Sequence, residues 1–576
     1  MIWLYRWIVD LFNALAAWYY RRKYGTAARQ LGRLPHEGEA GRRGFIILEI
    51  DGLAHDHLRQ ALRQDAMPYL NRLIMGHKLR LARWRCGLPG TTPASQAGIL
   101  YGNNWDIPGF RWYDKATGDS VLCKLPGTVR AIQERIAAGR AGLLRGGSSY
   151  TNLFDGDARL ALFTLSALGR HRLFENVRGL GFLVLFGLSP LGVLRVIGLS
   201  FWTWLAYVVK RFVSWIRARP RRFHFTFLGP LLEIFNNIIF REVTTFCVRV
   251  DVYRGMPAIY AAYTGYDEIA HHFGAESKEA FLALRGIDKQ IRKIDRIRQL
   301  YRPSEYDLYV LSDHGMTSSV PFRWAYGQTL EEFLAEQTGQ HVETGEGHGQ
   351  TEGLPEARAR FLLDEILGLE ARPRHRLSAQ LLRAARHRLE QRLPAEALTA
   401  EWDLGRRGDI EVRNSGSLSH IYLNVTPRQI DLSEVVLLYP SLLEALIAHP
   451  GIGLVVGRDG DEVVVAGQAG TLWLGADSER LEGQSPLDDL PNADWAAKQI
   501  ARLARFPHAG DLVLFGAWDG ESVISFEEQV ASHGGLGGPQ DSPFLAYPPE
   551  EGLVARGIDS AEEVYTRFIG VYGSYS

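Results

Sequence analysis

Several short segments of the chain carry oxygen and nitrogen donors that could hold metal ions or activate a nucleophile. The set consists of three aspartates, three histidines and two adjacent threonines: Asp51, Thr91, Thr92, Asp267, His271, Asp313, His314 and His533. Carboxylate oxygens and imidazole nitrogens are donors that Zn²⁺ prefers in proteins. Two such ions about 3.5–4 Å apart can stabilise both the attacking and the leaving oxygen of an in-line displacement. The set therefore predicts a two-metal site.

The two threonines precede a predicted helix. In the segment GLPGTTPASQAGILYG at 87–102, Pro93 suits the first turn of a helix that ends at Gly102. A hydroxyl at such a helix start faces backbone N–H groups and the positive end of the helix dipole. If a metal lowers the pKa of that hydroxyl, it can attack phosphorus while the helix terminus binds the phosphate. Thr91 and Thr92 both fit this role.

The aspartates follow strand-like runs. Asp51 comes directly after GFIILEI, Asp267 after MPAIYAAYTGY, and Asp313 after YDLYVLS. Helical patterns such as 280–300 lie between these runs, an order that is typical of a parallel sheet covered on both faces. Functional groups in such sheets collect at the carboxyl ends of the strands. We therefore expect the three aspartates to meet at one edge of the sheet.

Composition narrows the function classes. The chain has 576 residues, of which 46% are hydrophobic and 23% charged, which excludes wholesale disorder. The formal net charge is zero, so overall charge gives no support for a nucleic-acid partner. The three cysteines are far apart, which disfavours a disulfide scaffold or a cysteine-based zinc site and is more typical of a reducing compartment.

Two apolar regions predict association with a membrane. Residues 1–20 have apolar and aromatic residues around a helical face, and Arg21, Arg22 and Lys23 follow, as in a helix that lies in the membrane interface. Residues 179–209 are apolar except for a few positions, and basic residues flank both ends. Such flanks favour a hairpin or an in-plane element over a single crossing. Helices packed on the protein's own core are the alternative for both regions.

The ordered set of Asp51, TTPASQAG, Asp267-x-x-x-His271, Asp313-His314 and His533 resembles the alkaline-phosphatase superfamily, in its type I phosphodiesterase/nucleotide pyrophosphatase branch. The resemblance implies an α/β/α sandwich with a mostly parallel central sheet, a hydrophobic helical insertion and a cap-like insertion. The expected organisation has six parts. They are a membrane-associating helix at 1–25, core segments at 44–150, 245–330 and 406–576, a hydrophobic and basic insertion at 151–244, and a surface or cap insertion at 331–405.

The resemblance also implies roles for individual residues. Asp51, Asp313, His314 and the nucleophile would hold one metal, and Asp267, His271 and His533 the other. The ions would be two divalent cations, with Zn²⁺ expected and Mn²⁺ as the alternative. The mechanism implied is ping-pong, through a phosphothreonine. Counting back from Gly102 places the nucleophile at Thr92, whereas counting from Pro93 places it at Thr91; we favour Thr92.

The sequence departs from the family where relatives have a phosphate-binding asparagine. Here the chain reads NNWDIPGFRWYD, so Arg111, Asn103 or Asn104 could take that role, and we expect Arg111 and Asn103 to bind substrate. The predicted function is hydrolysis of a phosphodiester or related phosphoester at a membrane surface that faces the cytoplasm, and a lipid-linked phosphoester is one substrate that fits. The alternatives are a phospho-group transferase acting on a lipid-linked substrate and a catalytically inactive membrane scaffold.

Overall fold

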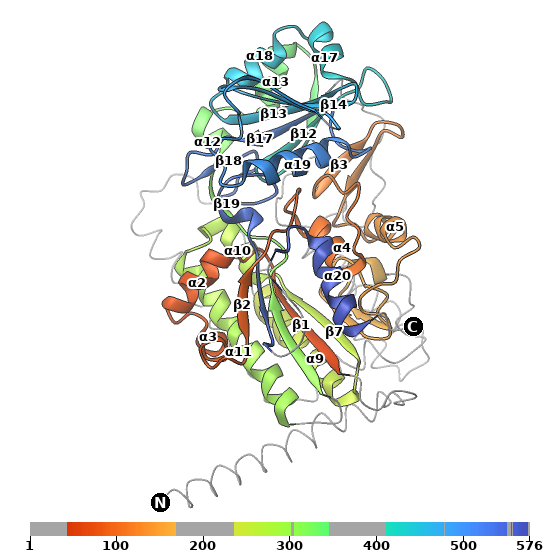
Figure 1. Cartoon of the computed structure of the whole chain (residues 1–576), viewed down its shortest axis with the longest axis vertical. Coiled ribbons are helices and arrows are strands. Elements are labelled where there is room, and N and C mark those ends of the chain that lie inside the picture. The colour runs from red at the N-terminus through yellow and green to blue at the C-terminus, as the bar shows by residue number, and fades with distance from the viewer. Residues whose placement is uncertain are drawn as a thin grey trace, which may run out of the picture.

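The computed structural model describes residues 43–168, 235–300, 305–344, 410–476, 478–549, 555 and 557–573. These residues form two lobes, each built around its own sheet (Figure 1). The predicted helix at 1–25, the apolar run at 179–209 and residues 345–405 of the predicted cap lie outside the described residues. Within the described ranges, no helix is both long and apolar enough to cross a membrane.

The first lobe contains the predicted sheet. It has seven strands in the order β2 (Arg80–Arg83), β20 (Phe544–Tyr547), β8 (Tyr306–Leu311), β1 (Gly44–Ile50), β7 (Ala258–Tyr263), β5 (Ser148–Tyr150) and β6 (Leu160–Leu162). β8, β1, β7, β5 and β6 pair in parallel, whereas β20 runs antiparallel to both of its neighbours. The mostly parallel central sheet is therefore confirmed.

The register of β1 shows that helices cover both faces of this sheet. The ring of Phe45 packs on Tyr572 of α20 (Ala561–Tyr572), and α20 packs on α4 (Thr92–Tyr101). The opposite face carries Tyr263 of β7, whose hydroxyl is 2.8 Å from that of Thr245 in α9 (Arg241–Arg254). α11 (Lys278–Leu300) packs against α9. This is the helix–sheet–helix layering that the sequence predicts (Figure 1).

Shorter elements complete the first lobe. They are α2 (His55–Arg63), α3 (Pro68–Met75), α5 (Pro126–Ile136), the 3-10 turn η1 (Leu165–Ala167), the π-helical turn η2 (Phe235–Phe240) and α10 (Gly265–Phe273). β3 (Arg111–Asp114) and β4 (Asp119–Leu122) form a two-stranded sheet that reaches the second lobe, where β3 packs on β11 (Ile410–Ser415) (Figure 1). The 3-10 turn η3 (Gly538–Asp541) precedes β20.

The second lobe is built on a mostly antiparallel sheet. Its eight strands lie in the order β10 (Val342–Thr344), β11 (Ile410–Ser415), β12 (Leu418–Leu423), β17 (Leu512–Gly516), β13 (Ile452–Asp459), β14 (Glu462–Gly467), β15 (Gly470–Leu474) and β16 (Glu479–Gly483). Its helices are α12 (Phe322–Tyr326), α13 (Leu330–Thr338), α17 (Leu432–Leu438), α18 (Leu442–Ala448) and α19 (Ala493–Ala504). Between the lobes lies a three-stranded sheet of β18 (Val523–Ser525), β9 (Thr317–Pro321) and β19 (Ala531–Ser532).

In the structure, the boundaries between core segments and insertions differ from those expected from the sequence. β6 and the start of α9 belong to the first lobe, so the described ends of the predicted insertion at 151–244 are part of the core. β10 pairs with β11, so residues 342–344 belong to the second lobe instead of a separate cap. Most of 406–576 builds that second sheet, and β20 and α20 return to the first lobe. Alternation in short antiparallel strands is a weak sequence signal, which is why the second sheet was not predicted.

Candidate active site

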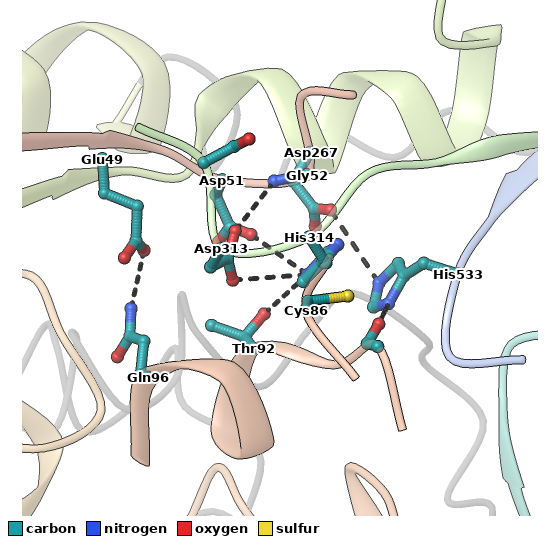
Figure 2. A network of polar contacts seen from close by, with 12 residues as sticks. Glu49, Asp51, Gly52, Cys86, Thr92, Gln96, Asp267, Asp313, His314 and His533 are labelled. Atoms are coloured by element: carbon teal, nitrogen blue, oxygen red, sulfur yellow. Dashed lines mark hydrogen bonds and ion pairs between the residues drawn. The ribbon is translucent and has the colours of Figure 1, made fainter. Parts of the chain in front are cut away.

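The carboxyl ends of three parallel strands meet at one point, as expected (Figure 2). Asp51 follows β1, Asp313 lies two residues after β8, and Asp267 lies in the first turn of α10, just after β7. Gly52 permits this convergence because it has a φ of 72° and a Cβ there would come within 2.5 Å of Asp267 Oδ1. Its N–H also donates to Asp313 Oδ1 at 3.2 Å. The turn after β1 thus contacts two of the three carboxylates.

His314 lies between two groups of potential ligands. Its Nε2 is 3.5 Å from Asp51 Oδ1 and 3.4 Å from Asp313 Oδ2. These three residues form one compact cluster, and Asp267, His314 and His533 form a second. His533 Nε2 lies 3.9 Å from Asp267 Oδ1, and the rings of His314 and His533 stack at 3.9 Å between centroids.

His271 adjoins the second cluster. Its Nε2 lies 3.3 Å from Asp267 Oδ2 at the i, i+4 spacing that the sequence analysis used, and its ring centroid is 5.1 Å from that of His533. All of the metal ligands proposed from the sequence therefore lie together.

The three histidines are oriented by the same kind of contact. Nδ1 of His271 lies 2.8 Å from Ala531 O, Nδ1 of His533 lies 2.9 Å from Gly90 O, and Nδ1 of His314 lies 3.0 Å from Gly315 O. A carbonyl oxygen can only accept, so each Nδ1 donates to it and each ring turns its Nε2 towards the carboxylates. This is how metal-binding histidines are usually held.

One oxygen of each carboxylate lacks a hydrogen-bond donor. Asp51 Oδ1, Asp267 Oδ1 and Asp313 Oδ2 are buried and have no hydrogen-bond partner in the structure. Burial, together with the charges of Asp313 and Asp267, raises the pKa of Asp51 well above its usual range. Buried carboxylate oxygens without donors are costly unless a cation binds them. The donor set therefore fits two divalent cations.

Thr92 is the threonine that contacts a proposed metal ligand. It is the first residue of α4, and its Oγ1 lies 3.2 Å from His314 Nε2. Thr91 precedes the helix, and its buried Oγ1 has no partner. The arrangement favours Thr92 over Thr91 as the group that meets a phosphoester (Figure 2).

A buried polar contact fixes the start of α4. Gln96, one turn after Thr92, donates to Glu49 Oε1 at 2.7 Å and accepts from the N–H of Leu153 at 2.8 Å. Tyr260 OH donates to the other carboxylate oxygen of Glu49. Sequence reasoning missed Gln96 and Glu49. The available signal was a single charged residue inside the otherwise apolar strand GFIILEI, which needs a buried partner.

A cavity of about 130 Å³ opens onto Asp51, Thr92 and Asp267. Arg111 also lines it, as the sequence predicts, and its guanidinium donates to Glu527 Oε1 at 2.9 Å. Asn103 is not among the lining residues; its side chain bonds to the backbone of Ile136 and Trp105 instead. The lining residues that the sequence did not point to include Lys124, Asn152, Glu268, Glu527 and Gln529.

One asparagine does reach the cavity. Asn152, in the loop after β5, is buried, and its Oδ1 has no hydrogen-bond partner in the structure. It lies about 50 residues beyond the NNWD segment, so the local sequence pattern gave no signal for it.

Comparison with known families gives an independent result. Residues 233–425 match the family described as type I phosphodiesterase / nucleotide pyrophosphatase, and this stretch contains Asp267, His271, Asp313 and His314. Asp51, Thr92 and His533 lie outside it, yet the fold brings them to the same point. This match confirms the resemblance seen in the motifs, and it assigns the stretch 233–425 to a family of hydrolases that act on phosphoester bonds.

Two solved structures illustrate the range of similar proteins. Phosphonoacetate hydrolase from Sinorhizobium meliloti 1021, in complex with phosphonoformate, is 15% identical with a TM-score of 0.46; 92% of this chain and 96% of that chain are covered. Murine ectonucleotide pyrophosphatase / phosphodiesterase 5 is 11% identical with a TM-score of 0.40, and 92% and 95% are covered. No curated protein sequence matches the chain.

The crowded carboxylates lead to a prediction about stability. At neutral pH in a chelator, we expect Asp51→Asn to unfold at a higher temperature than the parent, because it removes one of several buried negative charges. The pKa of Asp51 is raised by folding, so its ionisation costs stability as pH rises through the folded-state pKa. Below the ordinary carboxyl pKa the two proteins should unfold alike.

With zinc bound, the parent should unfold at a higher temperature than Asp51→Asn, because the variant has lost a metal ligand. Differential scanning calorimetry with and without zinc measures both effects, and Asp489→Asn, an exposed carboxylate of the second lobe, is the control. A lower unfolding temperature for Asp51→Asn in chelator would contradict the picture of uncompensated carboxylates.

Proposed function

We propose that the chain hydrolyses a phosphodiester by attack of the Thr92 hydroxyl on phosphorus, through a phosphothreonine intermediate. The observation that carries the proposal is the contact of Thr92 Oγ1 with His314, inside the carboxylate and histidine clusters. Two divalent ions, most simply Zn²⁺, would lower the pKa of the attacking group and stabilise charge on the departing oxygen. Asp51, Asp313, His314 and Thr92 would hold one ion, and Asp267, His271 and His533 the other.

The residues around Thr92 supply orientation. As the first helical residue of α4, Thr92 sits where backbone N–H groups and the helix dipole favour the negative charge of a phosphate. The Glu49–Gln96–Leu153 contacts hold this helix end against β1 and the loop after β5. Such fixed positioning of a nucleophile reduces the reorganisation that the reaction needs.

Arg111 of β3 and Glu527, between β18 and β19, supply further groups for substrate recognition. One guanidinium nitrogen of Arg111 donates to Glu527 Oε1, and the Gly416 N–H donates to Glu527 Oε2 at 2.8 Å. Arg111 Nε has no partner in the structure, which leaves a donor for a phosphate oxygen.

Apolar side chains form another part of the cavity wall: Phe110, Leu153, Phe163, Leu165 and Leu168. This apolar wall would favour a substrate in which an apolar group, such as that of a lipid-linked phosphoester, is attached to the phosphate.

The test uses three chromogenic substrates: p-nitrophenyl phosphate and its methyl and octyl esters. We expect metal-dependent release of p-nitrophenol from the esters, with the octyl ester having the higher kcat/KM. Thr92→Ala should lose at least about a thousandfold in kcat, as expected when a nucleophile is removed. Thr91→Ala should keep most of the activity, and Thr92→Ser should keep a measurable fraction.

With the methyl or octyl ester as substrate, p-nitrophenol is released first, so mass spectrometry of acid-quenched protein should find a methylphosphoryl or octylphosphoryl group on the peptide that contains Thr92. If Thr91→Ala lost activity and Thr92→Ala kept it, the nucleophile would be Thr91 and the proposed role of Thr92 would be wrong. No turnover by metal-loaded protein with any of the substrates would contradict the proposed function.

Arg111 gives a separate prediction. We expect Arg111→Lys to raise the KM for the diester about 10- to 100-fold. The lysine ammonium is a compact charge, whereas the arginine guanidinium has several N–H donors and can contact both Glu527 and the substrate. Asn103→Ala should leave kcat and KM within about twofold, since Asn103 does not line the cavity. Steady-state kinetics on both variants measures the difference. An equal effect of the two substitutions would contradict the assignment of Arg111 to substrate.

A further inference from the structure

α11 separates its charges between two faces. The aspartates Asp288 and Asp295 are buried. Asp288 accepts the backbone N–H groups of Tyr69 and Leu70, both at 2.9 Å, and Asp295 accepts the Tyr69 hydroxyl at 2.6 Å. These carboxylates tie the start of α3 to α11. They therefore face the interior, away from the cations on the outer side of the helix.

The outer side of α11 is basic. Exposed residues recur at three- and four-residue spacing along it, in the order Leu282, Arg285, Lys289, Arg292 and Arg296. This spacing places them on one face, over about 21 Å of helix. The stripe begins with an apolar residue and continues with four cations. Arg285 lies 3.8 Å from the exposed Asp65, a solvated contact that leaves most of its charge available.

The segment that ends α3 and leads to β2 extends this basic surface. Arg72, His77 and Lys78 line the same surface groove as Arg292 and Arg296. All five side chains are exposed. The formal net charge of the whole chain is zero, so this is a local concentration of positive charge.

Large apolar side chains are exposed on α3, on α11 and on the adjoining helix α10. Met75, the last residue of α3, is 72% exposed, and Leu282 is 66% exposed. Phe273 ends α10, which packs on α11, and is 55% exposed. A bilayer surface offers both anionic headgroups for the cations and an apolar layer for such side chains. A nucleic acid would use the cations but leave Met75 and Leu282 in water.

We propose that this basic–apolar face, formed by the outer side of α11, the end of α3 and residues 76–78, binds the surface of an anionic phospholipid bilayer. The chain also enters the described structure here, because Arg43 lines the groove. The segment before Arg43 includes the helix that the sequence predicts to be membrane-associating. The active site lies at the other end of β1, about 25 Å from the groove. The proposal therefore does not depend on the chemistry of hydrolysis.

The test is a lipid titration of the full chain with sedimented vesicles. One set of vesicles consists of phosphatidylcholine alone, and the other contains phosphatidylglycerol at roughly one lipid in three. Near such an anionic surface, each Lys or Arg increases the binding constant about fivefold. The variant is Lys78→Gln/Lys289→Gln/Arg292→Gln, whose three side chains are exposed and form no ion pair with the described residues. The matched control is Arg159→Gln/Arg458→Gln/Lys498→Gln, which removes three cations elsewhere.

We expect the triple variant to need about a hundredfold more anionic lipid for half-binding, and the control to change by less than about twofold. Both should hydrolyse a soluble diester like the parent, which shows that they are folded. Equal binding of parent and triple variant to anionic vesicles would overturn the proposal, as would equally tight binding of the parent to both kinds of vesicle. Loss of binding to single-stranded DNA without loss of vesicle binding would assign the face to nucleic acid and also overturn it.

Discussion

The repulsion among buried carboxylates is the constraint on which the rest of this structure depends. Asp51, Asp267 and Asp313 converge at one sheet edge, with buried oxygens that no hydrogen-bond donor reaches. Burial and neighbouring carboxylates raise the pKa of Asp51 and Asp313, whereas His271 and the other histidines hold the pKa of Asp267 below its usual range, so only part of the negative charge is compensated. Divalent cations would turn the same cluster into a strong binding site. The fold therefore keeps in place an arrangement that fits divalent cations.

Both lobes are needed to complete that arrangement. The first lobe brings the aspartates, His314 and Thr92 together through three neighbouring parallel strands and one helix start. His533 reaches the site from the connection between the lobes, and its Nδ1 contacts Gly90 O in the loop before Thr92. Glu527, on the same connection, holds Arg111 over the cavity. The residues proposed to bind substrate and metal are thus positioned by contacts between residues 416 and 443 positions apart in the chain.

Much of this could be predicted from the sequence for a simple reason. Buried parallel strands are continuous apolar runs, and their last residues must meet at one edge, so Asp51, Asp267 and Asp313 could be placed together without a structure. His533 could be recognised only by its glycine-rich context and by resemblance to a family. Arg111 was found because a basic residue stood where relatives have an asparagine.

Other features left no readable signal. Asn103 is close to Arg111 in sequence, but its side chain serves the local backbone, and proximity in sequence does not decide which side chain faces a cavity. Asn152 and Gln529 reach the cavity through tertiary packing alone. The second sheet contains hairpins of consecutive strands, but its central strand β17 pairs with β12 and β13, which lie far from it in sequence, and such pairings cannot be derived from local patterns.

Anomalous diffraction from crystals grown with zinc tests the central claim most directly. The account predicts two zinc peaks about 3.5–4 Å apart. One peak should contact Asp51, Asp313, His314 and Thr92, and the other should contact Asp267, His271 and His533. No zinc at this sheet edge, or a single ion held without Thr92, would contradict the account.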